Sequence, residues 1–227
     1  MLTLWGRSTS VNVQKPMWLL AELGLAYERK DVGGPFGGLD DPAFRALSPA
    51  GLIPALLDER AGRRAAVFES AAILRYLAAI ERAEAFWPSD PQARAQVDSY
   101  AEWAQAAVYP PLTALFLGIV RTPVPDRDAG ALKAALETLL ARLVVAERRL
   151  SAQEWLAGAS PGATLADIVF GAALHRILTL EITRPETPAL EAYYSRLKDR
   201  PAYRSVIAVD YDAMRVSGAE RAAAPVV

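Results

Sequence analysis

The 227-residue chain contains no cysteine and only one histidine, His175. Without cysteine it can form no disulfide, zinc–cysteine site, thiol nucleophile or CxxC redox motif. A single histidine also argues against a histidine-centred metal site, so we expect no bound metal. His175 stands beside Arg176 in a helical pattern, where we expect it to be packed or solvated.

An excess of charge of one sign is missing as well. The 25 Lys and Arg residues nearly balance the 26 Asp and Glu residues, for a formal net charge of −1. We therefore expect no nucleic-acid partner and no membrane-surface partner. We also expect no membrane-spanning run, and the opening MLTLWGR lacks the order of a signal peptide. The cytoplasm is the expected compartment.

The first 80 residues alternate between strand-length and helical patterns. Residues 2–5 and 27–32 are predicted strands on either side of a helix from Val11, and such a βαβ unit requires parallel strands. Residues 54–58 and 64–68, joined by the turn ERAG, predict a β-hairpin that leads into an amphipathic helix. With a brief helix after Asp41-Pro42, the order βαβ-α-ββα matches an α/β thioredoxin-like fold.

Helical patterns alone follow this first part. The segment ERAEAFWPSD interrupts the pattern, so we predict a thioredoxin-like domain over 1–81, a linker over 82–90 and an all-helical (all-α) domain over 91–227. Within the latter, Pro110-Pro111 must bend or break a helix. Thr164 and Asp167 have the spacing of a capping box before an apolar helix.

The entry to the hairpin suggests a peptide-binding edge. X-Pro is the only common place for a cis bond, and if the bond before Pro54 is cis, the N–H and C=O of Ile53 can pair with a peptide laid alongside. The alternative is that Pro54 merely begins an edge strand.

The exit from the hairpin suggests an anion site. Glu69 and Ser70 fall in the first turn of the next helix, where backbone N–H groups and the helix dipole favour a carboxylate. Glu69 could hold an ammonium group beside that carboxylate. The alternative is an ordinary helix cap.

These stretches resemble a known family. SPAGLIPAL and VFESAAILRYL are similar to the NPxGxxPxL and ESxAIxxYL motifs of glutathione transferases, which bind the tripeptide γ-Glu-Cys-Gly. The resemblance implies that Ile53 and Pro54 hold the cysteinyl backbone and that Glu69 and Ser70 hold the γ-glutamyl end. Leu52 stands where many members have Lys or Gln, so the partner of the glycine carboxylate is unassigned.

The turn RSTSVN after the first strand offers groups for the glutathione thiol. Its thiolate is the reactive form, and a hydroxyl donor at a helix N-terminus stabilises it. Ser8, Thr9 and Ser10 qualify by chemistry, and alignment with serine-type members of the family favours Ser10. The side-chain amide of Asn12 is a second candidate. Alternatively, Ser10 only caps the helix.

The resemblance implies a cytoplasmic glutathione S-transferase of the serine type, with glutathione as co-substrate and a homodimeric assembly. The electrophile is expected against the helical domain, with Trp103 and Tyr109 as candidate contacts. A related glutathione-dependent peroxidase or dehalogenase would use the same thiolate. A non-enzymatic binding or assembly module is the alternative from another class. The resemblance also implies that Asp167 is a folding determinant.

Overall fold

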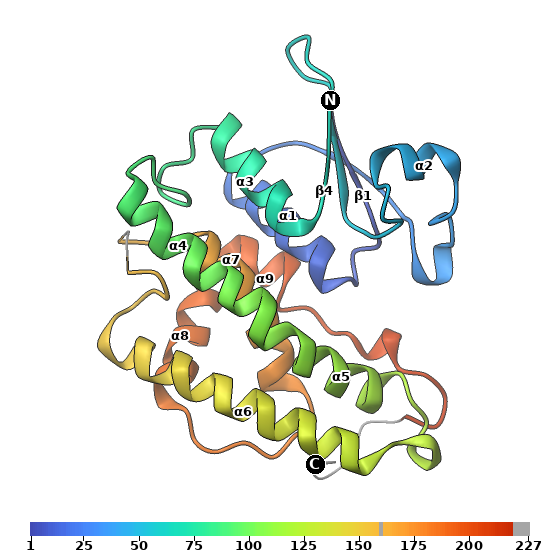
Figure 1. Cartoon of the computed structure of the whole chain (residues 1–227), viewed down its shortest axis with the longest axis vertical. Helices are drawn as coiled ribbons and strands as arrows, with labels where there is room; N and C mark the ends of the chain where they lie inside the picture. The colour runs from blue at the N-terminus through green and yellow to red at the C-terminus, as the bar shows by residue number, and fades with distance from the viewer. Residues whose placement is uncertain (159–160, 220–227) are drawn as a thin grey trace. The chain divides into compact units, whose positions relative to one another are not determined.

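A computed structural model describes residues 1–158 and 161–219 (Figure 1). The chain divides into two compact units, Met1–Ser89 and Asp90–Val227. Most of the segment predicted as a linker, 82–90, is therefore part of the first unit. The first unit has a mixed sheet with helices and the second is mostly helical, so the predicted fold class is confirmed.

One four-stranded sheet, in the order β2-β1-β3-β4, forms the centre of the first unit. β1 runs parallel to β2 and antiparallel to β3, and β3 runs antiparallel to β4. This is the predicted pairing, because a helical crossover joins parallel strands and a short turn joins antiparallel ones. The strands are β1 (Leu2–Trp5), β2 (Glu28–Lys30), β3 (Ala55–Asp58) and β4 (Ala65–Phe68).

Helices lie on both sides of this sheet, as Figure 1 shows, with α1 and α3 together on one side and α2 on the other. On the α2 side, Phe44 and Leu47 form a buried cluster with Val32 and Ala55. On α1 and α3, several large apolar side chains are fully buried: Trp18, Leu19, Leu20, Ile73 and Leu77. The helices are α1 (Val11–Glu22), α2 (Pro42–Leu47) and α3 (Ser70–Ile80), with a short 3-10 turn η1 (Gly34–Phe36) before α2.

The second unit is a set of helices packed around one of them, α7 (Leu165–Thr179). Twelve of the 15 residues of α7 are buried. Its N-terminus has the predicted capping box, in which Asp167 Oδ2 accepts from the N–H and the hydroxyl of Thr164, both at 2.8 Å. The other helices are α4 (Pro91–Trp103), α5 (Tyr109–Val120), α6 (Ala129–Ala152), α8 (Pro188–Lys198) and α9 (Pro201–Val206).

Pro110-Pro111 does not end the helical path. A π-helical turn, η2 (Ala104–Val108), connects α4 to α5, and the two prolines then occupy the first turn of α5. A proline costs little there, because the first N–H groups of a helix have no intrahelical acceptor. The expected bend is therefore a change of helical winding just before the prolines.

The structure corrects the expectation that no segment is long and apolar enough to cross a membrane. Pro91–Val120, which runs through α4, η2 and α5, passes that test by length and composition, the single helix among the described residues that does. Half of its most apolar window is buried inside the protein. A core helix of a globular unit has the same character.

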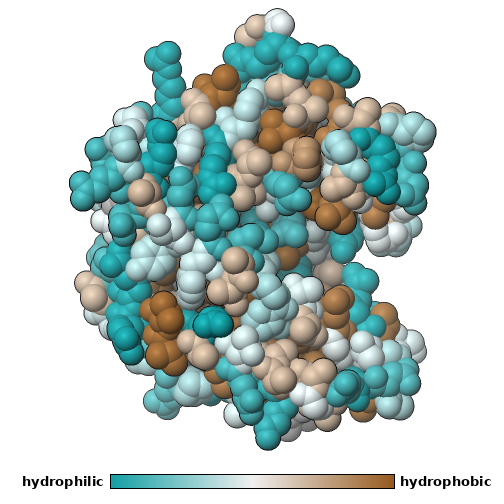
Figure 2. Space-filling model, viewed as in Figure 1, coloured by the Kyte–Doolittle hydropathy of each residue, from teal (hydrophilic) through white to brown (hydrophobic). Residues whose placement is uncertain are grey.

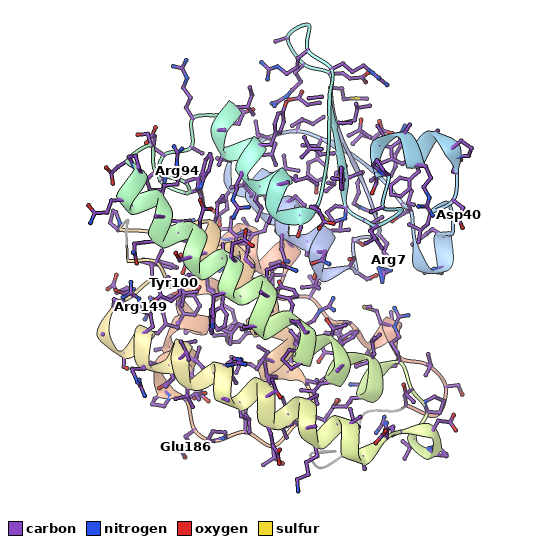
Figure 3. The ribbon with its side chains drawn as sticks, viewed as in Figure 1. Arg7, Asp40, Arg94, Tyr100, Arg149 and Glu186 are labelled. Carbon is purple, nitrogen blue, oxygen red and sulfur yellow. The ribbon has the colours of Figure 1, made fainter. Side chains whose placement is uncertain are left out.

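Charged side chains support the helical packing at its surface. Figure 3 shows Arg149 of α6 beside Tyr100 of α4, and the guanidinium carbon lies 4.9 Å from the ring centre. Arg149 also donates to the carbonyls of Leu156 and Ala157 at 3.0 and 2.9 Å. Earlier in α6, Val144 and Val145 are 54% and 44% exposed, and Figure 2 shows hydrophobic side chains gathered over this helix.

Candidate functional site

The strand register brings the separate sequence motifs to one edge of the sheet, the edge formed by the ends of β1, β2 and β4 and the start of β3. Trp5 at the end of β1 pairs with Lys30 at the end of β2 and with Ala55 at the start of β3. Ala55 in turn pairs with Phe68, the last residue of β4. The RSTSVN turn, the Ile53-Pro54 step and the Glu69-Ser70 pair therefore all adjoin the same edge.

Side-chain packing against Gly6 and backbone hydrogen bonds hold this edge together. Gly6 has a φ of 142°, and a Cβ there would come within 2.5 Å of Val13 and 3.2 Å of Ile53. The Gly6 N–H donates to the carbonyl of Lys30 at 2.8 Å, and the Arg7 N–H donates to the carbonyl of Val32 at 3.2 Å. The turn after β1 is thus tied to the loop after β2. Its Arg7 side chain, labelled in Figure 3, packs over Gly34.

Ser10 is the N-cap residue of α1. Its backbone is extended (φ −80°, ψ 123°), and its carbonyl accepts from the N–H groups of Val13 and Gln14, both at 2.9 Å. Within the described residues, its side chain makes no capping hydrogen bond and no acidic side chain lies in the first turn. The half-buried hydroxyl of Ser10 therefore stands at a positive helix end without a competing carboxylate.

Ile53 has the backbone geometry that a strand-adding ligand needs. The Ile53–Pro54 bond is cis, the isomer that the sequence suggested. Ladder pairing begins only at Ala55, and among the described residues no backbone hydrogen bond uses the N–H or C=O of Ile53. A peptide laid along this residue could pair with both groups.

Glu69 has an unusual backbone conformation at the start of α3. Its φ is 69° and its ψ is 125°, a combination that costs roughly 1–3 kcal/mol for a residue with a side chain. Its side chain is exposed and, as far as the described residues go, does not cap the helix. The strained backbone is a candidate for function, since such strain persists where surrounding structure holds it for a purpose.

Sequence reasoning missed Lys15, a residue of α1 that is 0% exposed. Its ammonium donates to Asn12 Oδ1 at 2.9 Å and to the Ser70 hydroxyl oxygen at 3.4 Å. It thus connects two residues that the sequence singled out separately, and Ser70 itself is only 4% exposed. A lysine among the buried apolar residues of this helix was the available signal, since lysines are rarely buried without partners.

The candidates in the second unit have different surroundings. Tyr109 is 5% exposed and its hydroxyl donates to the carbonyl of Val169 at 2.9 Å, so it belongs to the helical core. Burial raises the pKa of this phenol. Trp103 is half-buried, with its ring centre 5.9 Å from that of Phe170. The placement of Tyr109 does not support the expected contact with an electrophile.

His175 is held by hydrogen bonds within the same unit. Its Nδ1 lies 2.8 Å from the Tyr194 hydroxyl and its Nε2 lies 3.1 Å from the carbonyl of Val209. Burial is the main cause that lowers the pKa of His175. In the part of the chain that the structure describes, no group of three or more His, Asp or Glu side chains is arranged to hold a metal ion.

The fold is that of a thioredoxin-like domain joined to an all-helical domain. The family model for the glutathione S-transferase N-terminal domain matches residues 9–80, and that for the C-terminal domain matches residues 98–201. The chain belongs to the glutathione S-transferase family.

Individual relatives agree with this assignment. Glutathione S-transferase GstB of Escherichia coli is 33% identical over 209 residues, which cover 92% of this chain and 99% of GstB. Glutathione S-transferase 3 of Zea mays is 31% identical, with coverages of 91% and 93%. A crystal structure of the theta class enzyme from Xanthomonas axonopodis pv. citri, with glutathione bound, has a TM-score of 0.85 and 39% identity, covering 92% and 98% of the two chains.

Proposed function

We propose that this protein conjugates the thiolate of glutathione to electrophilic small molecules, as a detoxifying transferase would. The main support is the register that places the Ser10 turn, Ile53 and the Glu69-Ser70 pair at one edge of one sheet. A tripeptide with a central thiol and a free amino acid end has groups for all three places.

In this proposal Ser10 donates a hydrogen bond to the sulfur. A free thiol has a pKa of about 8.5, so only a few per cent is ionised at neutral pH. A hydroxyl donor and the positive end of α1 stabilise the anion, and each pKa unit gained corresponds to about 1.4 kcal/mol. Asn12, on the first turn of the same helix, is a second donor for the sulfur.

The remaining groups hold the rest of the peptide. Ile53 pairs with the cysteinyl main chain through its N–H and C=O, beside Pro54. Ser70 donates to the γ-glutamyl carboxylate, and Glu69 accepts from the neighbouring ammonium group. Holding both ends of the peptide fixes the sulfur beside its donors, which converts binding energy into orientation for attack.

For the electrophile, we propose side chains of the helical unit, with Trp103 as the first candidate. We also propose a homodimer in the cytoplasm, where a glutathione pool is present. Exposed apolar side chains on the first unit support an assembly: Phe36 is 56% exposed, Leu52 59% and Phe68 40%. Sedimentation velocity over a range of protein concentrations tests the dimer.

The test of the function is a spectroscopic titration of glutathione bound to the purified protein, followed by a panel of electrophiles. We expect the thiol pKa to fall by at least about one unit below its value in water. A peroxide or haloacid preferred in the panel would shift the reaction class to a peroxidase or dehalogenase. A bound thiol that ionises as in water would favour the non-enzymatic module.

A further inference from the structure

Lys15 lies in the interior of the first unit and connects α1 to the start of α3. It is fully buried, 55 residues before Ser70 in the chain, and it contacts a residue of its own helix and the first residue of α3. A buried ammonium is costly unless polar groups compensate it. Two of the compensating atoms belong to Asn12 and Ser70, the residues proposed to face the thiolate and the γ-glutamyl carboxylate of glutathione.

The chemistry of an ammonium group fixes the roles of both neighbours. Lysine has three N–H donors and no acceptor. The Asn12 atom 2.9 Å away must therefore be the amide oxygen, and the amide nitrogen with its two protons points away from Lys15. By the same reasoning the Ser70 oxygen accepts at 3.4 Å, so its own proton is directed elsewhere.

We propose that Lys15 is a positioning residue that makes Asn12 and Ser70 donors toward the ligand at the same time. The inference rests on the proposed function, in which Asn12 faces the thiolate and Ser70 faces the γ-glutamyl carboxylate. Both ligand groups are anions, and a donor turned toward each strengthens its binding.

The thiol side is tested with Lys15→Met, Asn12→Ala and the double variant, with Lys133→Met as a control. Lys133 is an exposed lysine of α6, so its variant removes the same charge far along the chain. The readout is the pKa of bound glutathione, followed by thiolate absorbance. We expect Lys15→Met to raise this pKa by about one unit and to lower the thiolate fraction roughly tenfold, with no change for the control.

The double variant shows whether Lys15 acts through Asn12. We expect Asn12→Ala to raise the thiol pKa by a similar amount, and Lys15→Met to add nothing in that background. Equal effects of Lys15→Met with and without Asn12 would overturn the positioning role. If Lys15→Met fails to fold, an unchanged thiol pKa in Asn12→Ala overturns it equally.

The carboxylate side is tested by binding of S-methylglutathione, which has no ionisable thiol. We expect Lys15→Met to weaken this binding a few-fold, and Lys15→Arg, which keeps a donor and the charge, to recover most of it.

A wild-type protein that leaves the thiol pKa at its value in water contradicts the proposed function. A wild-type shift that survives in Lys15→Met contradicts only the role of Lys15.

Discussion

The hydroxyl of Tyr76, on α3, donates to Asp58 Oδ2 at 2.9 Å and so ties this helix to the end of β3. Arg60 donates to the same carboxylate from its backbone N–H, Nε and Nη2, at 2.9 to 3.0 Å. Arg60 also pairs with Glu81, the residue after α3, at 2.7 Å. Asp58 is therefore the centre of a network that joins the hairpin to the helix carrying Ser70.

Asp58→Asn should destabilise the first unit by about 3 kcal/mol at neutral pH, because it removes the buried charge that Arg60 pairs with. Hydrogen bonds from Arg60 hold the pKa of Asp58 well below its usual range. A lowered pKa in the folded state gives stability that is present above the unfolded pKa of about 3.9 and is lost as pH falls. Urea unfolding from pH 7 to pH 3 should therefore show the stability difference between wild type and variant beginning to narrow below about pH 4. A gap that stays constant over this range would contradict the role of the charge.

Asp167→Ala should destabilise the second unit by several kcal/mol. Within the described residues, the carboxylate accepts four hydrogen bonds, two from Thr164, one from the Leu156 N–H at 2.9 Å and one from the Tyr193 hydroxyl at 2.8 Å. Its removal leaves buried donors unsatisfied, at roughly 1–3 kcal/mol each. The matched control is Asp90→Ala at the exposed cap of α4, where about 1 kcal/mol is expected. Equal losses in denaturant unfolding would show that Asp167 is an ordinary cap.

Ser10→Ala should lower kcat/KM for conjugation by about tenfold or more while glutathione still binds. The reason is that its hydroxyl stabilises charge on sulfur, an interaction that matters most in the reactive state. Steady-state kinetics with one electrophile, together with the thiol pKa, give the measurement. Ser8→Ala, in the same turn, is the matched control and should keep wild-type rates. If Asn12→Ala loses more activity than Ser10→Ala, the amide is the leading donor.

Glu69→Gln should weaken glutathione binding by about tenfold, since a charge-assisted hydrogen bond is worth roughly 1.5–3 kcal/mol. The specific check uses a glutathione analogue that lacks the α-amino group. Wild type and variant should bind this analogue equally, because the analogue lacks the ammonium group that the Glu69 carboxylate would bind. A variant that loses affinity for both ligands alike would point to a change in the backbone conformation of residue 69 instead.

Local patterns were sufficient for most of the fold. Residues 2–5 form the predicted strand, and the helices predicted from Val11 and at the Glu69-Ser70 pair begin at Val11 and Ser70. The second strand was predicted over 27–32 but extends only over Glu28–Lys30. β2 is an outer strand of the sheet and, among the described residues, pairs only with β1. The sequence pattern does not show where that pairing stops.

The sequence by itself determined the order of the elements, the turn hydroxyls around Ser10, and the Ile53-Pro54 and Glu69-Ser70 steps, because caps, turns and periodicity are properties of neighbouring residues. Tertiary structure alone decided that these steps share one sheet edge, that Tyr109 is buried and that Lys15 lies between Asn12 and Ser70. Those facts depend on strand register and on helix packing across some 55 residues, where the contacts between distant side chains, and not their local preferences, set the position of each group.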